Sequence, residues 1–150
     1  MEKTYYLAQI NVARAKISLD APEMHGFTSR LDEINALGES QKGFIWRLVE
    51  KEDDIPVNIS VFKDRKLAVN MSVWESVADL KHFTYQTMHK ELIRGKKAWF
   101  EQLESAAYVL WWVEVGKLPT IKEGKAKLEL LTKNGPTAAA FDFKNVFEPE

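Results

Sequence analysis

The fold is decided by residues 67–113, LAVNMSVWESVADLKHFTYQTMHKELIRGKKAWFEQLESAAYVLWWV. Residues 67–74 alternate between two faces, and a period of two predicts a strand. Ser76 and Asp79 have the spacing of a capping box and predict the start of a helix. Apolar residues at helical spacing continue to Leu103. The unbroken apolar run 106–113 predicts a buried strand, because it is too short to cross a bilayer.

The N-terminal part of the chain adds two strands and a helix. Residues 5–12 alternate between apolar and polar side chains, which predicts a strand. Asp20 followed by Pro22 predicts a helix start, and Gly38 predicts the end of that helix. Residues 43–49 predict a second strand whose two faces are Phe44, Trp46 and Leu48 against Ile45, Arg47 and Val49.

Two further elements are expected outside this pattern. Residues 57–62 predict a short additional strand. A capping box formed by Thr120 and Glu123 predicts a C-terminal helix that ends at Asn134. Three aromatic residues follow in the tail, which is unusual for a disordered segment, so we expect the tail to pack on the body or on a partner subunit. They are Phe141, Phe143 and Phe147.

The order of elements predicts an α+β protein with a ferredoxin-like βαββαβ sheet, antiparallel, with helices on one face. A chain of 150 residues is expected to form one domain. Its core would span about residues 4–115, with the C-terminal helix and packed tail at 119–150. Several strands are apolar on both faces, so a second copy of the chain is the simplest cover for the free face, and we expect a homodimer.

Charge and composition exclude several classes of partner. A net charge of −1 argues against a nucleic-acid-binding protein. The sequence contains no cysteine, which excludes disulfides and thiolate chemistry and fits a reducing compartment. The first residues show no signal peptide and no segment long enough to span a membrane, so a cytoplasmic protein is expected.

The segment VNMSVWESVADLKHFTYQTMH, residues 69–89, resembles the strand–VWxS–helix–His signature of dimeric α/β-barrel proteins. These include antibiotic-biosynthesis monooxygenases and haem-degrading monooxygenases. Over nearly its whole length the chain is similar to an uncharacterised bacterial family, domain of unknown function 3291, through LAQINVAR, NALGESQKGFIWRL, VNMSVWES, WF and VLWWV. The resemblance implies the dimeric α/β-barrel fold and no settled activity.

Common catalytic motifs are missing from the sequence. It has no GxGxxG or GxxxxGK[ST] loop for phosphates and no GxSxG nucleophile. The histidines His25, His82 and His89 have no recognised metal-ligand spacing, so no metal site is predicted.

Polar and aromatic side chains on apolar elements predict a small-molecule site instead. Asn11 shares a strand face with Gln9, and Asn70 shares one with Ser72 and Trp74. The other candidates are Arg47, Phe83, His89 and Trp112. Each candidate also has a purely structural interpretation. The asparagines would face solvent or the interface between the two copies of a dimer, and Arg47 would form an ion pair across that interface. The tryptophans and His89 would belong to the core.

Two functional classes remain open. Resemblance to cofactor-independent monooxygenases implies an aromatic, polyketide-like substrate that is deprotonated and then oxidised by dioxygen. His89 would be the base, and Arg47, Asn11 and Asn70 would stabilise a developing phenolate. Haem-degrading relatives use a helix histidine to ligate iron, but Phe83 stands where they have tryptophan, and His89 falls about one turn early. In the second class the protein only binds an apolar or aromatic ligand, or forms a structural dimer.

Overall fold

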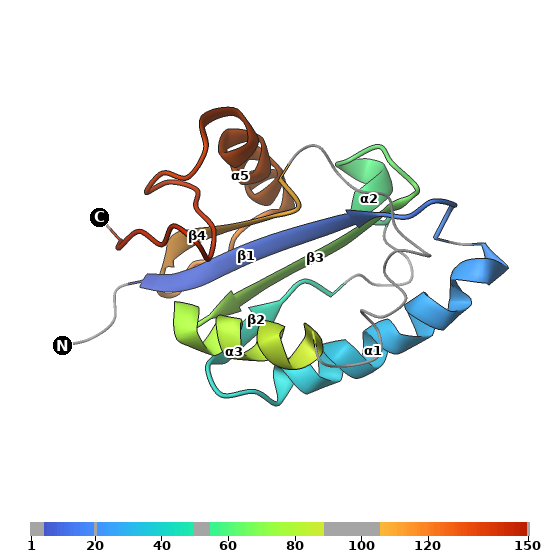
Figure 1. Ribbon diagram of the computed structural model, residues 1–150, viewed down its shortest axis with the longest axis horizontal. Coiled ribbons are helices and arrows are strands. Elements are labelled where there is room, and N and C mark those ends of the chain that lie inside the picture. Colours follow the sequence, from blue (N-terminus) through green and yellow to red (C-terminus); the bar gives the residue numbers. More distant parts are fainter. Residues whose placement is uncertain (1–4, 20, 50–54, 89–105, 150) are drawn as a thin grey trace.

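The computed structural model describes residues 5–19, 21–49, 55–88 and 106–149. Its centre is a four-stranded antiparallel sheet with the order β2-β3-β1-β4 (Figure 1). This arrangement confirms the predicted ferredoxin-like α+β fold. The strands are β1 (Tyr5–Arg14), β2 (Phe44–Arg47), β3 (Leu67–Trp74) and β4 (Tyr108–Glu114).

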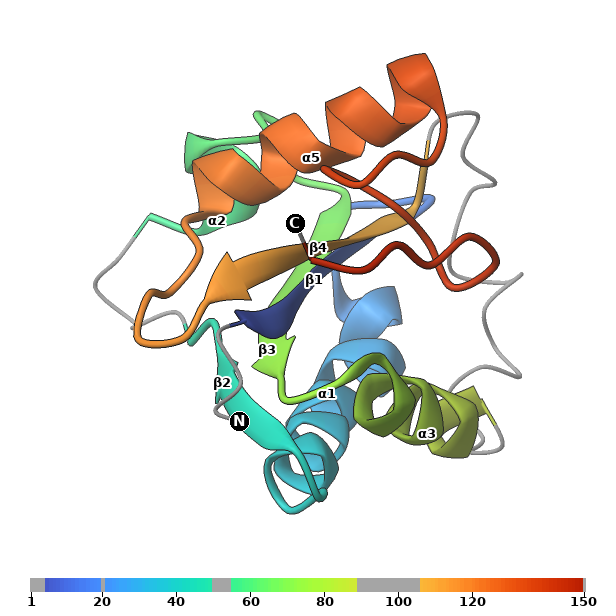
Figure 2. The ribbon, with the colours of Figure 1, turned by 90° about the vertical axis from the view of Figure 1, so that its left-hand side faces the viewer.

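Helices lie on both faces of the sheet. Figures 1 and 2 show α1 and α3 on one face and α5 on the opposite face. The helical elements are the 3-10 turn η1 (Pro22–Met24), α1 (His25–Glu39), α2 (Val57–Ser60), α3 (Val77–Met88) and α5 (Ile121–Asn134). None of these described helices is both long enough and apolar enough to cross a membrane.

The face beneath α5 is a closely packed apolar core. Ala8, Ile10 and Val12 of β1 are buried there, together with Leu128 and Leu131 of α5. The approach of α5 is tightest at a glycine, since a Cβ on Gly124 would lie 2.9 Å from Cδ1 of Ile10. The C-terminal helix of the same chain therefore covers this part of the face that sequence analysis assigned to a second copy.

The homodimer stays a prediction, but its interface would have to lie outside the part of the face that α5 covers or displace α5. A twofold mass in light scattering at micromolar concentration is expected if the chain dimerises, and a monomeric mass would contradict it.

Two local expectations from the sequence were wrong. Residues 57–60 form a helix instead of a strand, because extended Pro56 precedes them and its carbonyl accepts the amides of Ile59 and Ser60. A short apolar run does not by itself distinguish strand from helix. Gly38 also does not end its helix, which continues to Glu39.

The position of Gly38 has a packing reason. A Cβ there would lie 3.1 Å from the ring of Phe83, so the missing side chain makes room for the aromatic residue of α3. Asp20, the predicted N-cap of this helix, lies outside the described residues.

Both predicted helix starts are confirmed, each with the N-cap half of the predicted capping box. The amide of Asp79 donates to Oγ of Ser76 at 3.1 Å, at the start of α3. The amide of Glu123 donates to Oγ1 of Thr120 at 3.1 Å, at the start of α5. These bonds satisfy amides that have no partner within the helix.

The C-terminal tail packs along the edge of β4. Phe141 is fully buried and exchanges two backbone hydrogen bonds with Leu110, of 2.8 and 2.9 Å. The ring of Phe143 lies 5.5 Å from that of Tyr108. Phe147 is 37% exposed, and its carbonyl accepts the indole N–H of Trp112 at 2.7 Å.

We predict that Phe141→Ala lowers the free energy of unfolding by about 3–5 kcal/mol, because it empties a fully enclosed position. Phe147→Ala is the matched control in the same tail, and its partly exposed ring should contribute clearly less. Urea denaturation followed by circular dichroism measures both. Equal losses for the two variants would contradict the prediction that the enclosure of Phe141 makes its contribution larger than that of Phe147.

Candidate functional site

Pairing between strands aligns polar side chains on the sheet face toward α1 and α3. Gln9 of β1 lies opposite Ser72 of β3, and Asn11 lies opposite Asn70. Trp74 lies opposite Leu7 one step further along the same strands. Residues paired across strands share a face, so the two asparagines and Trp74 predicted for the site do lie together.

These five polar or aromatic residues form one hydrogen-bonded group, which we call the amide network: Gln9, Asn11, Asn70, Ser72 and Trp74. Nε2 of Gln9 donates to Oγ of Ser72 at 2.7 Å and to Oδ1 of Asn70 at 2.9 Å. The indole N–H of Trp74 donates to the same Ser72 oxygen at 2.8 Å. Nδ2 of Asn11 donates to Oε1 of Gln9 at 2.8 Å.

The amide network runs from the interior to the surface. Gln9 and Ser72 are the buried polar residues of the described chain, with exposed fractions of 5% and 6%. Asn70 is half-buried and Asn11 is exposed. Nδ2 of Asn70 also reaches Oδ1 of Asn35 on α1 at 3.5 Å, which connects the network to the covering helix. Burying amides is tolerated here because they bond to one another.

An aromatic wall adjoins the network at Trp74. The ring of Phe83 stacks on it at 5.2 Å between centroids and 22° between planes. Phe44 of β2 meets the same indole edge-on at 5.5 Å. The Ser76 cap begins α3 immediately after β3, so the helix places Phe83 back over the end of the strand. Trp74 is therefore both a core residue and a neighbour of the polar group.

A bulge in β2 brings Arg47 to the same face. The register shifts between Phe44 and Trp46, so Phe44 lies opposite Trp74 while Arg47 lies opposite Ser72. An inserted residue re-aims the side chains that follow it. The prediction that Phe44 and Arg47 lie on opposite faces is therefore wrong.

Arg47 is held by its own chain. Its Nε donates to Oε2 of Glu39 at 3.2 Å, and Nη1 reaches the carbonyl of Leu48 at 3.4 Å. This ion pair is local, in contrast to the pair across a dimer seam that sequence analysis considered. The guanidinium has five N–H donors, so these two bonds leave others for a ligand.

Trp112 lies apart from the network. It occupies the same row as Trp74, but Leu7 lies between them. The tail covers it, since its indole N–H bonds to Phe147 and its ring lies 6.2 Å from that of Phe141. Trp112 therefore packs in the same apolar cluster as Trp74 and Phe83, while its hydrogen bond goes to the tail instead of the amide network.

Tyr108 borders the network opposite Asn11. Burial raises the pKa of Tyr108, and the charge of Asp142 adds to that effect, although the amide of Phe143 donates to the hydroxyl at 3.1 Å and opposes it. The phenol therefore stays protonated near neutral pH and is unsuited to act as a base there.

Two residues of the amide network were not selected from the sequence, and the predicted base lies outside the described residues. The strand patterns placed Gln9 and Ser72 on the correct faces, but neither was chosen as a site residue. Two adjoining polar positions in otherwise apolar strands were a usable signal. His89, the predicted base, lies outside the described residues. In the described part of the chain, no cluster of three or more His, Cys, Asp or Glu side chains could hold a metal ion.

The family Domain of unknown function (DUF3291) matches residues 6–150. The chain belongs to this family. None of the curated proteins compared with this DUF3291 protein matches it significantly.

Two solved structures are similar to the DUF3291 chain. SnoaB, a cofactor-independent oxygenase from Streptomyces nogalater, is 15% identical in sequence to this chain. The structural alignment covers 79% of this chain and 100% of SnoaB, and its TM-score is 0.48. PA3566 from Pseudomonas aeruginosa is 16% identical, with 79% of this chain and 99% of PA3566 covered and a TM-score of 0.46.

We predict that Ser72→Ala destabilises the protein by about 1–3 kcal/mol, because two buried N–H donors, from Gln9 and Trp74, lose their shared acceptor. The exposed Ser60 of α2 provides the control, and Ser60→Ala should change the stability by less than about 0.5 kcal/mol. Urea denaturation measures stability, and the indole N–H resonance of Trp74 reports the lost bond. An unshifted resonance together with unchanged stability would show that the bond to Ser72 does not form.

Proposed function

We propose that this DUF3291 protein binds a small aromatic molecule that carries a hydrogen-bonding oxygen, at the sheet face formed by the amide network. The observation that carries the proposal is the buried Ser72 hydroxyl beside the stacked Trp74 and Phe83 rings. Small-molecule sites typically combine apolar and aromatic walls with a few convergent polar groups.

The bonding of Ser72 indicates which ligand atom would fit. Its oxygen accepts two N–H bonds, from Gln9 and Trp74. A hydroxyl keeps one hydrogen to donate, and no described residue accepts it in a hydrogen bond. A carbonyl or phenolate oxygen of a ligand would supply that acceptor. Arg47, opposite Ser72 on β2, would favour a ligand whose oxygen carries negative charge.

We further propose that the bound molecule is oxidised by dioxygen without a cofactor, the reaction that the resemblance to cofactor-independent monooxygenases implies. One oxygen atom would replace two hydrogens of the substrate and the other would leave as water, so the substrate itself supplies the electrons. Amides, a hydroxyl, an indole and a guanidinium can orient and stabilise an anion, but none of them is a base near neutral pH. His89 is therefore the residue proposed to take the first proton.

The alternative function is binding without catalysis. It is favoured by one observation, namely that the amide network contains hydrogen-bonding groups but no titratable base. The two functions differ in a single measurable property, the consumption of dioxygen by the bound complex.

The test uses anthrone and simple quinols as probes, with dioxygen uptake measured by electrode and binding measured by protein NMR. We expect binding that Ser72→Ala weakens and Ser60→Ala leaves unchanged. If the reaction is catalysed, His89→Phe should reduce uptake by about 10²-fold or more while binding persists, because general-base catalysis contributes that much.

Three results separate the outcomes. Binding without uptake would leave only the binding function. Binding that is unaffected by Ser72→Ala would remove the amide network from the site. A Soret shift during a haem titration, with saturation at one haem per chain, would favour a haem protein over both proposals.

A further inference from the structure

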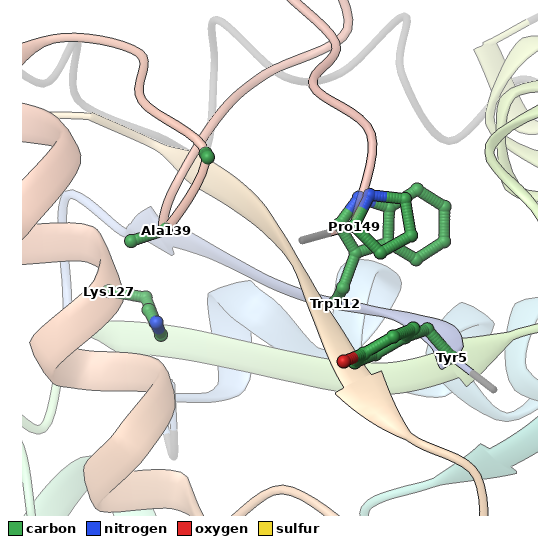
Figure 3. A pocket seen from close by; sticks show the side chains of 6 residues that line it. Tyr5, Trp112, Lys127, Ala139 and Pro149 are labelled. Carbon is green, nitrogen blue, oxygen red and sulfur yellow. The ribbon is translucent and has the colours of Figure 1, made fainter.

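A hollow lies at the outer edge of β4, where α5, the tail and the start of β1 meet. It has a volume of about 170 Å³ and is lined by Tyr5, Trp112, Lys127, Ala138, Ala139 and Pro149. In Figure 3, Lys127 extends from α5 on one side of this hollow, and Tyr5 and Trp112 lie on the other. None of these residues belongs to the amide network.

The turn at residues 137–140 of the C-terminal tail borders the hollow without filling it. Thr137 and Ala140 exchange backbone hydrogen bonds of 2.8 and 3.2 Å, which close a tight turn with two alanines at its tip. Methyl groups at Ala138 and Ala139 form a wall without filling the space. The bond from Trp112 to the carbonyl of Phe147 holds the indole in place and positions the tail that brings Pro149 to the rim.

The hollow contains one cation, Lys127, that has no partner among the described residues. Lys127 is half-buried, and it forms no ion pair or hydrogen bond with the described residues. Two carboxylates of the adjoining elements have other partners: Glu114 of β4 pairs with Lys117, and Glu123 of α5 accepts the indole N–H of Trp111 at 2.7 Å. A half-buried lysine on one side of a hollow and two aromatic rings on the other are suited to an anion attached to a flat apolar group.

We propose that this hollow binds a single-ring aromatic carboxylate. The ring would lie against Trp112, Tyr5 and Pro149, and the carboxylate would pair with Lys127. The size agrees, since an apolar cavity of about 150 Å³ is enough to hold benzene. None of the lining residues belongs to the amide network, so this proposal does not depend on the function proposed above.

The experiment titrates the protein with benzoate and follows the assigned indole N–H resonance of Trp112 by NMR. We expect a saturable shift with a Kd on the order of 1 mM, suited to so small a ligand. Phenol, which has the ring without the charge, and acetate, which has the charge without the ring, should each bind at least about tenfold more weakly.

Two variants test the geometry and one controls for charge. Lys127→Met should weaken benzoate binding about tenfold or more, because it removes the ammonium and keeps the length of the side chain. Ala139→Leu should abolish binding by filling the hollow. Lys133→Met removes an exposed lysine from the last turn of the same helix and should leave the Kd unchanged.

Several results would overturn the proposal. One is the absence of any saturable shift of the Trp112 resonance up to about 20 mM benzoate, roughly twentyfold above the expected Kd. Another is equal Kd values for Lys127→Met and Lys133→Met. If Lys127→Met does not fold, unchanged benzoate binding by Ala139→Leu would be sufficient to reject the site.

Discussion

The antiparallel pairing of β1 with both β3 and β4 is the constraint on which the other features depend. Because β1 lies between β3 and β4, the residues at its centre have strand neighbours on both sides. Leu7, Ala8 and Ile10 are accordingly fully buried. The alternation of side chains along this strand then assigns apolar packing to α5 and polar bonding to the face under α1 and α3.

A glutamine in such a strand can be tolerated only if its amide is bonded, since an unbonded buried amide is costly. Gln9 meets that requirement through Ser72 and Asn70 on the adjacent strand, and Asn11 bonds to its carbonyl in turn. If these positions contributed only to stability, apolar residues would stabilise the sheet at least as well. The retention of a connected polar group beside an aromatic stack is therefore the strongest structural argument for a binding role.

The sequence predicted the sheet and two helix starts well, because strand alternation and capping boxes are local signals that tertiary contacts here reinforce. It failed at 57–60, where a short apolar run is equally compatible with a strand or a helix, and at β2, where a one-residue bulge is invisible to period-two reasoning. The position of Trp112, separated from Trp74 by Leu7 and covered by the tail, depends on strand order, which one sequence does not reveal. The bonds among Gln9, Asn70 and Ser72 needed the register for the same reason.

The position of α5 has a consequence for how the protein behaves at low concentration. When the apolar face of a sheet is covered by a second molecule, folding and association are coupled, and dilution unfolds the protein. Here Leu128 and Leu131 provide that cover from within the same chain, next to Ile10 and Val12. The effective concentration of the covering helix is fixed by the connection that links it to β4, from Val115 to Thr120, and does not change with dilution. Dilution should therefore leave the chain folded, whether or not it associates with other copies.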